Sequence, residues 1–187
     1  SAYYLSINRN KESVTLDFRT AEGATILRRL VEKADVLVEN FRPGVLDRLD
    51  LGYAACSRLN PRLVYASITG YGRTGPESDR PGYDLIAQGE GGVMSLTGDP
   101  AGPPWKTGVS QADITAGLWT LSGILAALYE RETTGLGRLV EMALIDGQVS
   151  LLGYQALNHF LGHAPGRRGN RHPNLTPYET FATKDGW

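Results

Sequence analysis

An alternation of short apolar runs with helix-like intervals constrains the fold of this chain more than any other feature of its sequence. Compact runs rich in β-branched or apolar residues lie at 36–38, 63–68 and 140–144. Apolar residues recur at helical spacing over 20–33, and a second helical interval ends near Asn60. Because strands that pair in parallel need a helical crossover between them, this order predicts an α/β fold with an open parallel sheet and flanking helices.

Further elements follow from the same patterns. Residues 13–17 alternate polar and apolar side chains, which is typical of a short strand. Helices are expected over 83–96, despite its glycines, and over about 146–161. Between them, a Gly- and Pro-rich loop at 98–108 leads into a long helix. That helix carries an apolar stripe as far as Arg131, formed by Ile114, Leu118, Leu121, Leu125 and Leu128.

We place a domain boundary near residue 161. Residues 1–161 hold all the elements of the expected sheet, whereas 162–187 contains a run of glycines, prolines and basic residues and is expected to be a linker. The chain begins without a methionine and stops in what resembles the approach to a strand. We therefore expect further elements on both sides of it.

Composition argues against several classes of function. Nineteen Lys and Arg nearly cancel twenty Asp and Glu, and the formal net charge of −1 leaves no basic surface for nucleic acid. The longest nearly unbroken apolar stretch, 118–129, is shorter than the ~20 residues that a membrane helix requires. The single cysteine, Cys56, cannot form an internal disulfide and no signal peptide opens the chain, so a cytoplasmic protein is expected.

Two motifs suggest cofactor or metal sites but lack the context that such sites need. Residues 70–75 match the dinucleotide fingerprint G-x-G-x-x-G, but Pro76 and Pro81 follow where a helix should open to hold a pyrophosphate. His159 and His163 are spaced to share a helix face, without the glutamate of an H-E-x-x-H motif. We expect no metal site and no permanently bound cofactor.

Two other features are open to both a structural and a functional interpretation. Asp113 lies just before the long apolar helix, where an aspartate commonly caps the helix, so its position alone does not select it. Residues 40–44 follow a strand at the carboxyl edge of the sheet, where α/β proteins bind ligands. Their amide and aromatic groups, with Arg42 and Arg48, would suit a nucleotide, while Pro43 and Gly44 would equally suit a turn.

Several segments, in order along the chain, resemble class III coenzyme A transferases of the CaiB/BaiF type. They include Asn8-Arg9-Asn10-Lys11, the run from Ala34 to Val45, Gly82-Tyr83-Asp84 and Gly169-Asn170. The resemblance implies a Rossmann-like large domain, here without its N-terminal strand and without the small domain that follows. It also implies an interlocked homodimer that acts on a coenzyme A thioester and a carboxylic acid.

The resemblance assigns roles to six residues. Asp113 would attack the acyl-CoA thioester, and transfer to a free carboxylic acid would then pass through a mixed anhydride and an aspartyl-CoA thioester. Asn40, Phe41 and Arg48 match positions along the path of the nucleotide and pantetheine, and Tyr83 and Asp84 match a pair beside the thioester. Arg42 and Lys106 are weaker candidates for contacts with coenzyme A.

Two other functions fit the same resemblance. The related α-methylacyl-CoA racemases carry a histidine where this chain has Tyr83, and a tyrosine of pKa ~10 is a poor base at neutral pH compared with a histidine of ~6.5. A non-catalytic CoA-binding paralogue would have no need for Asp113. The identity of the acceptor is open; three basic residues of the linker would suit a carboxylate or simply form a solvated turn, namely Arg167, Arg168 and Arg171.

Overall fold

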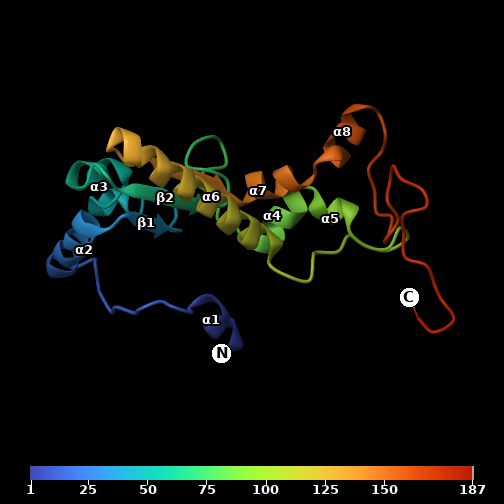
Figure 1. Cartoon of the computed structure of the whole chain (residues 1–187), viewed down its shortest axis with the longest axis horizontal. Helices are drawn as coiled ribbons and strands as arrows, with labels where there is room; N and C mark the ends of the chain where they lie inside the picture. Colours follow the sequence, from blue (N-terminus) through green and yellow to red (C-terminus); the bar gives the residue numbers. More distant parts are fainter. Residues whose placement is uncertain (187) are drawn as a thin grey trace.

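The computed structural model describes residues 1–186 and consists of helices around a small sheet (Figure 1). The elements, in chain order, are α1 (Ala2–Ile7), α2 (Ala21–Lys33), β1 (Val36–Glu39), the 3-10 helix η1 (Asp47–Leu49), α3 (Tyr53–Leu59), β2 (Val64–Thr69), α4 (Asp84–Glu90), α5 (Val93–Leu96), α6 (Gln111–Thr134), β3 (Leu139–Ala143), α7 (Leu144–Leu151) and α8 (Tyr154–Phe160).

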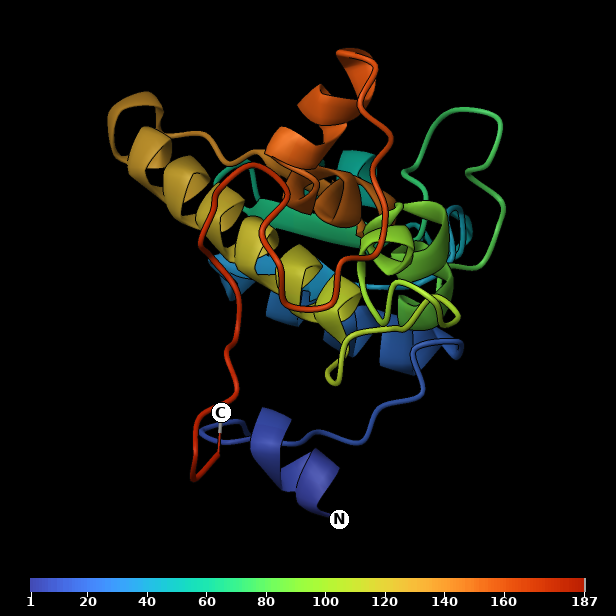
Figure 2. The ribbon, with the colours of Figure 1, turned by 90° about the vertical axis from the view of Figure 1, so that its right-hand side faces the viewer.

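The three strands pair in parallel in the order β1-β2-β3, which confirms the predicted α/β fold. Val36 pairs with Val64, and Tyr65 pairs with Leu139 at the start of the second ladder. The chain crosses from β1 to β2 through α3, and from β2 to β3 through α4, α5 and α6. Helices therefore flank both faces, with α6 along one of them (Figures 1 and 2).

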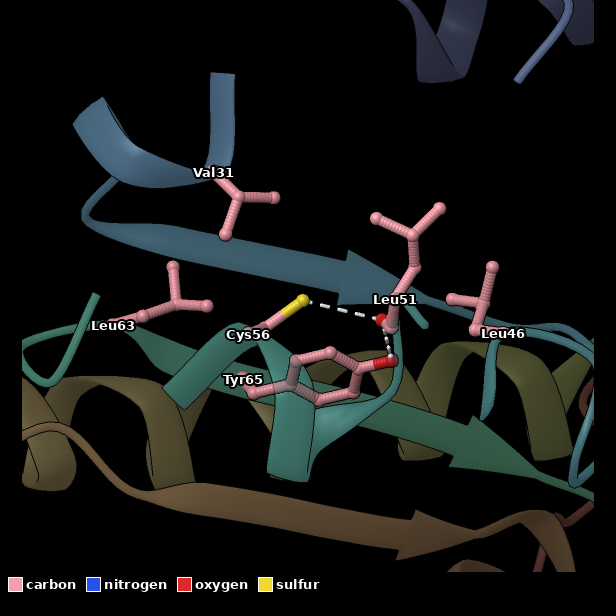
Figure 3. Close-up of a cluster of buried hydrophobic side chains, with 6 residues drawn as sticks. All are labelled: Val31, Leu46, Leu51, Cys56, Leu63 and Tyr65. Carbon is pink, nitrogen blue, oxygen red and sulfur yellow. Dashed lines mark hydrogen bonds between the residues drawn. The ribbon is translucent and has the colours of Figure 1, made fainter. Parts of the chain in front are cut away.

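The main core lies between the sheet and the helices α2 and α3. Tyr65 of β2 is fully buried there, and its hydroxyl donates a hydrogen bond of 3.3 Å to the Leu51 carbonyl (Figure 3). The Cys56 thiol contacts the same carbonyl at 3.2 Å, and burial raises its pKa to about 11, so we expect an unreactive thiol. The buried residues of this cluster are Val31, Leu46, Leu51, Cys56, Leu63 and Tyr65.

Helix α6 turns its predicted apolar stripe outward. Four residues of that stripe, Ile114, Leu118, Leu121 and Leu125, are between 50% and 61% exposed. The helix instead meets the rest of the protein through residues that are mostly small, because small side chains let a helix lie close to a sheet. The buried residues are Ala112, Ala116, Thr120, Ala127 and Arg131.

By length and composition alone, α6 is long and apolar enough to cross a membrane, a test that core helices of soluble proteins also pass. In this structure it packs against β2, β3, α4 and α7. At its carboxyl end, the buried Arg131 donates hydrogen bonds to the Asp35 carboxylate at 2.9 Å and to the Arg62 carbonyl at 3.1 Å. Arg131 thus joins α6 to the segments that lead into β1 and β2.

We expect two identical substitutions in α6 to have opposite effects on stability. At Gly123, an added Cβ would lie 2.7 Å from Val140 Cγ1, whereas at Gly117 it would meet no atom within 4 Å. Gly117→Ala should therefore stabilise the protein by about 0.5–1 kcal/mol through helix propensity alone. Gly123→Ala should destabilise it by about 1–3 kcal/mol, because the methyl overpacks the contact with β3. Urea unfolding measures both; stabilisation by both variants would show that α6 is not in close contact with the sheet.

The strand predicted at 13–17 is wrong. Within residues 1–186, no strand pairs with this segment, which runs as an irregular chain from α1 to α2. A strand needs a backbone partner, and alternation of side chains does not supply one. Val14 and Leu16 instead help to line an apolar groove of about 320 Å³ beside β1. The helix α1 was not predicted.

Two helices that we predicted as continuous are each interrupted at a glycine. The helix expected over 83–96 is divided into α4 and α5, and Gly92 between them has a φ of 87°. The helix expected over 146–161 starts earlier, at Leu144, and is divided into α7 and α8 at Gly153, whose φ is 50°. Such left-handed conformations are readily adopted only by glycine, and they end an α-helix.

Residues 162–186 contain no helix or strand beyond an isolated bridge between Thr183 and Gly186. This part of the predicted linker folds back on the loop before α6, where the Gly169 amide donates to the Gly98 carbonyl at 3.1 Å. Trp187, the last residue of the predicted linker, lies outside the described residues.

Candidate active site

Three of the predicted CoA-binding residues line one cavity at the carboxyl ends of β1 and β2. Asn40 and Phe41 follow β1, and Tyr83 precedes α4. The cavity has a volume of about 220 Å³. Arg42, a weaker candidate, also lines it; the remaining lining residues, which we did not predict, are Pro43, Thr69, Gly70, Arg80, Pro81 and Gly82.

Hydrogen bonds from neighbouring strands fix the first wall of this cavity. The Asn40 side-chain amide donates to the Ile68 carbonyl at 2.6 Å, so its side chain joins the ends of β1 and β2. The Phe41 amide donates to the Glu39 carboxylate at 2.8 Å. The Phe41 ring packs edge-on against Phe18, with 5.9 Å between centroids, and remains 45% exposed. A half-exposed ring held in this way can stack on a planar ligand.

A close backbone crossing forms the second wall. Gly70 and Gly82 contact each other directly, and a methyl group on either would overlap the backbone of the other. The crossing closes residues 70–82 into a loop that brings Tyr83 to the cavity. No helix begins in this loop, so the dinucleotide-like motif at 70–75 has no helix N-terminus for a pyrophosphate.

Arg73 anchors this loop to β1, η1 and β3. Its guanidinium lies 3.6 Å from the Glu39 carboxylate, 3.0 Å from that of Asp47 and 3.4 Å from that of Glu141. The side chain is only 20% exposed, and Glu39 also accepts a hydrogen bond from Ser67. We did not predict Arg73, because its partners lie far apart in the sequence.

Arg80 holds the other end of the loop against α4. Its guanidinium pairs with Glu77 at 2.7 Å and with Glu90 at 2.6 Å, and it stacks over the Tyr71 ring at 4.5 Å. The Tyr71 hydroxyl donates to Glu90 at 2.7 Å. These contacts use most of the hydrogen-bond donors of Arg80, so few remain for a ligand in the cavity.

Asp84 does not line the cavity but connects it to Asp113. One carboxylate oxygen accepts a hydrogen bond from the Ala112 amide at 2.8 Å, and the other accepts one from the Gln88 side chain at 2.7 Å. Asp84 therefore fixes the first turn of α6 against α4. A carboxylate at this position also suits the positive end of the helix.

Asp113 is not the cap of α6. The helix begins at Gln111 after Ser110, which places Asp113 third in its first turn, with an exposed side chain. Among residues 1–186, its carboxylate has no hydrogen-bond or ion-pair partner. Partial burial, and secondly the negative charge of Asp84, raise the pKa of Asp113 above its ordinary value. An unpaired carboxylate of raised basicity in the first turn of a helix is suited to act as a nucleophile.

The remaining candidates lie outside the cavity. Arg48, on η1, is exposed, and its guanidinium lies near Gly44. The Lys106 ammonium donates to the neighbouring Thr107 carbonyl at 2.9 Å and is also exposed. In the part of the chain that the structure describes, no three His, Cys, Asp or Glu side chains form a metal-binding group.

The fold and the site define an α/β protein with a cavity at the carboxyl edge of its parallel sheet, which Asp84 links to the start of the helix that carries Asp113. The whole chain, residues 1–187, matches the model of CoA-transferase family III, and it belongs to this family. This membership confirms the resemblance found in the sequence.

Known relatives agree with this membership. The chain is 47% identical to the succinate–glutarate CoA-transferase of Agrobacterium fabrum, over 100% of this chain and 47% of that protein. It is 43% identical to the acetyl-CoA:oxalate CoA-transferase of Acetobacter aceti, over 99% of this chain and 48% of that protein. The crystal structure of a CaiB/BaiF family protein from Brucella suis superposes with a TM-score of 0.93 and 48% sequence identity. The match covers 100% of this chain and 50% of that protein. The chain thus spans about half the length of the relatives it matches.

Proposed function

We propose that the full-length protein transfers coenzyme A from an acyl-CoA donor to a free carboxylic acid, with Asp113 as the nucleophile. The observation that carries this proposal is the unpaired carboxylate of Asp113, next to the Asp84 contact that joins α6 to α4, in a chain from CoA-transferase family III. The names of two relatives mention succinate, glutarate and oxalate, all of them dicarboxylic acids. We therefore propose a dicarboxylic acid as the acceptor.

The proposed reaction returns Asp113 to its starting state. Its carboxylate attacks the thioester carbonyl, the C–S bond breaks, and the coenzyme A thiolate leaves a mixed anhydride. The thiolate then attacks the aspartyl carbonyl and releases the donor acid, which gives an aspartyl-CoA thioester. The acceptor carboxylate attacks this thioester and releases the thiolate, which finally attacks the acceptor carbonyl and frees Asp113. Each addition develops an oxyanion that hydrogen-bond donors of the full-length protein would stabilise.

We further propose that coenzyme A enters through the cavity formed by Asn40, Phe41 and Tyr83. The Phe41 ring would stack on the nucleotide or pack against the pantetheine, and the exposed Tyr83 would border the thioester beside Asp84. The guanidinium of Arg42, which lines the cavity, and the exposed guanidinium of Arg48 would meet phosphates. In this proposal coenzyme A is a substrate, and no permanently bound cofactor takes part.

Trapping with hydroxylamine tests the covalent role of Asp113. The full-length protein is incubated with succinyl-CoA and then with hydroxylamine, which converts an activated aspartyl group to a hydroxamate. Peptide mass spectrometry should locate the modification at Asp113, and omission of succinyl-CoA should abolish it. Protein that binds coenzyme A yet remains unmodified, or that catalyses only α-proton exchange on a branched acyl-CoA, would refute the transferase assignment.

We also propose that the protein is a homodimer, and the exposed apolar face of α6 supports this. Leu118, Leu121, Leu125 and Tyr129 project from it, with Tyr129 82% exposed. A continuous apolar surface of this kind usually marks an interface. Leu125→Glu should prevent the two chains from assembling into a dimer as they fold, because a buried, unpaired charge is costly at an interface.

Light scattering coupled to size exclusion measures the mass of wild type and of this variant. Thr25→Glu, on an exposed position of α2, introduces the same charge away from α6 and should leave the mass unchanged. A wild-type monomer, or a Leu125→Glu dimer, would contradict the proposed interface.

We place the protein in the cytoplasm, without a membrane or nucleic-acid partner, as part of the same proposal. The formal net charge of −1 and the single reduced, buried Cys56 support this placement.

A further inference from the structure

A second cavity, of about 480 Å³, lies between the loop before α6 and the segment that follows α8. Pro100 lines it from the loop, and the other lining residues belong to 166–180. Three hydrogen bonds to carbonyls of the loop hold the segment in place: the Gly169 amide donates to Gly98, and the Arg167 guanidinium donates to Asp99 at 3.2 Å and to Gly102 at 2.6 Å. The cavity is therefore built from two ordered walls.

Three arginines line this cavity against one carboxylate. Arg167 uses its Nε and one terminal nitrogen on the loop carbonyls, which fixes its plane and leaves its other terminal nitrogen free. Arg171 uses its Nε on Glu179 at 3.4 Å, which leaves both of its terminal nitrogens. Arg168 has no side-chain partner among residues 1–186. A guanidinium has five N–H donors and no acceptor, so the cavity offers a surplus of donors and of positive charge.

The lining of this cavity carries more positive than negative charge. Three guanidiniums repel one another, and Glu179 balances only one of them. Carboxylates and phosphates are the groups that pair with planar guanidiniums through two hydrogen bonds. An anion with two charges would neutralise the two that remain.

We propose that this cavity is an anion site for a small dicarboxylate, a ligand class that rests on the acceptor proposed above. Arg167 provides a fixed donor, and Arg168 and Arg171 provide adjustable ones. The loop that Arg167 holds runs on into the first turn of α6, which carries Asp113. The backbone between Gly102 and Gln111 therefore connects the wall of the site to the helix that carries the nucleophile.

Arg168→Gln is the sharpest test, because Arg168 makes no contact that the fold needs. In the full-length protein, succinate or glutarate titrated by calorimetry should bind about tenfold more weakly to this variant, since one charge-assisted pair is lost. The KM for the dicarboxylate should rise by a similar factor with kcat unchanged. Arg29→Gln, an exposed position on α2, makes the same charge change elsewhere and should alter neither quantity.

Coenzyme A and dephospho-coenzyme A are titrated in parallel, because a phosphate group would suit the same donors. Weaker binding of coenzyme A alone, with dicarboxylate binding intact, would overturn the dicarboxylate assignment in favour of a phosphate. Unchanged binding of every ligand in both Arg168→Gln and Arg171→Gln would overturn the site. Neither outcome affects the test of the reaction itself, which is the loss of transfer in an Asp113 variant. Failure of the anion site is therefore distinguishable from failure of the proposed reaction.

Discussion

Asp113→Asn should abolish coenzyme A transfer, with kcat lower by at least about 10³-fold. The amide keeps the shape of the side chain but is too weak a nucleophile to form the anhydride. The measurement is transfer from succinyl-CoA to a panel of dicarboxylates by the full-length protein. Asp79→Asn, at an exposed position of the loop before α4, removes the same charge and should retain full activity.

The same variant should be more stable than wild type at neutral pH. The raised pKa of Asp113 means that folding disfavours its ionised form. Wild type carries this penalty at every pH above the folded pKa, and it disappears once pH falls below the unfolded value of ~3.9, where both states are protonated. Thermal unfolding should therefore show the advantage of Asp113→Asn at pH 7 and its loss near pH 3. Equal stability at pH 7 would argue against a desolvated carboxylate.

Gly82→Ala should damage both stability and activity. The methyl would overlap the backbone of Gly70, so the loop must open, and we expect a loss of about 3 kcal/mol in unfolding free energy. Opening moves Tyr83 and Asp84 away from the cavity and from α6, and a displacement of ~1 Å can lower kcat/KM about 10²-fold.

Gly108→Ala serves as the control for this variant, because a Cβ there meets no atom within 4 Å. It should leave stability and kcat/KM nearly unchanged. Wild-type kinetics in Gly82→Ala would show that the crossing of the two glycines does not shape the site.

The sequence predicted the parallel sheet because strongly apolar runs such as 63–68 have few other places to lie than between two layers of helices. It could not predict which face of α6 is buried. Leucines dominate a hydropathy pattern, but the face of α6 that packs on the sheet carries small residues such as Ala116. Leu118 is exposed on the other side of the helix. Close approach of backbones decides this packing, and a pattern of hydrophobicity does not record it.

Some residues of the candidate site were also predictable from the sequence, and others were not. Asn40 and Phe41 were expected at the carboxyl edge because they directly follow a strand, and the cavity there confirms their position. Arg73 and the crossing of Gly70 with Gly82 escaped prediction, since each depends on partners that only the folded chain brings together. The roles of these residues in binding coenzyme A stay predictions.

A single cation holds together the edge of the sheet where the cavity lies. Arg73 meets carboxylates from the end of β1, from η1 and from β3, which would repel one another without it. The shape of the cavity thus depends on a charge balance, whereas the core below it depends on apolar burial. Removal of one of these charges should therefore change the shape of the cavity, whereas truncation of a buried apolar side chain should lower the stability of the whole fold.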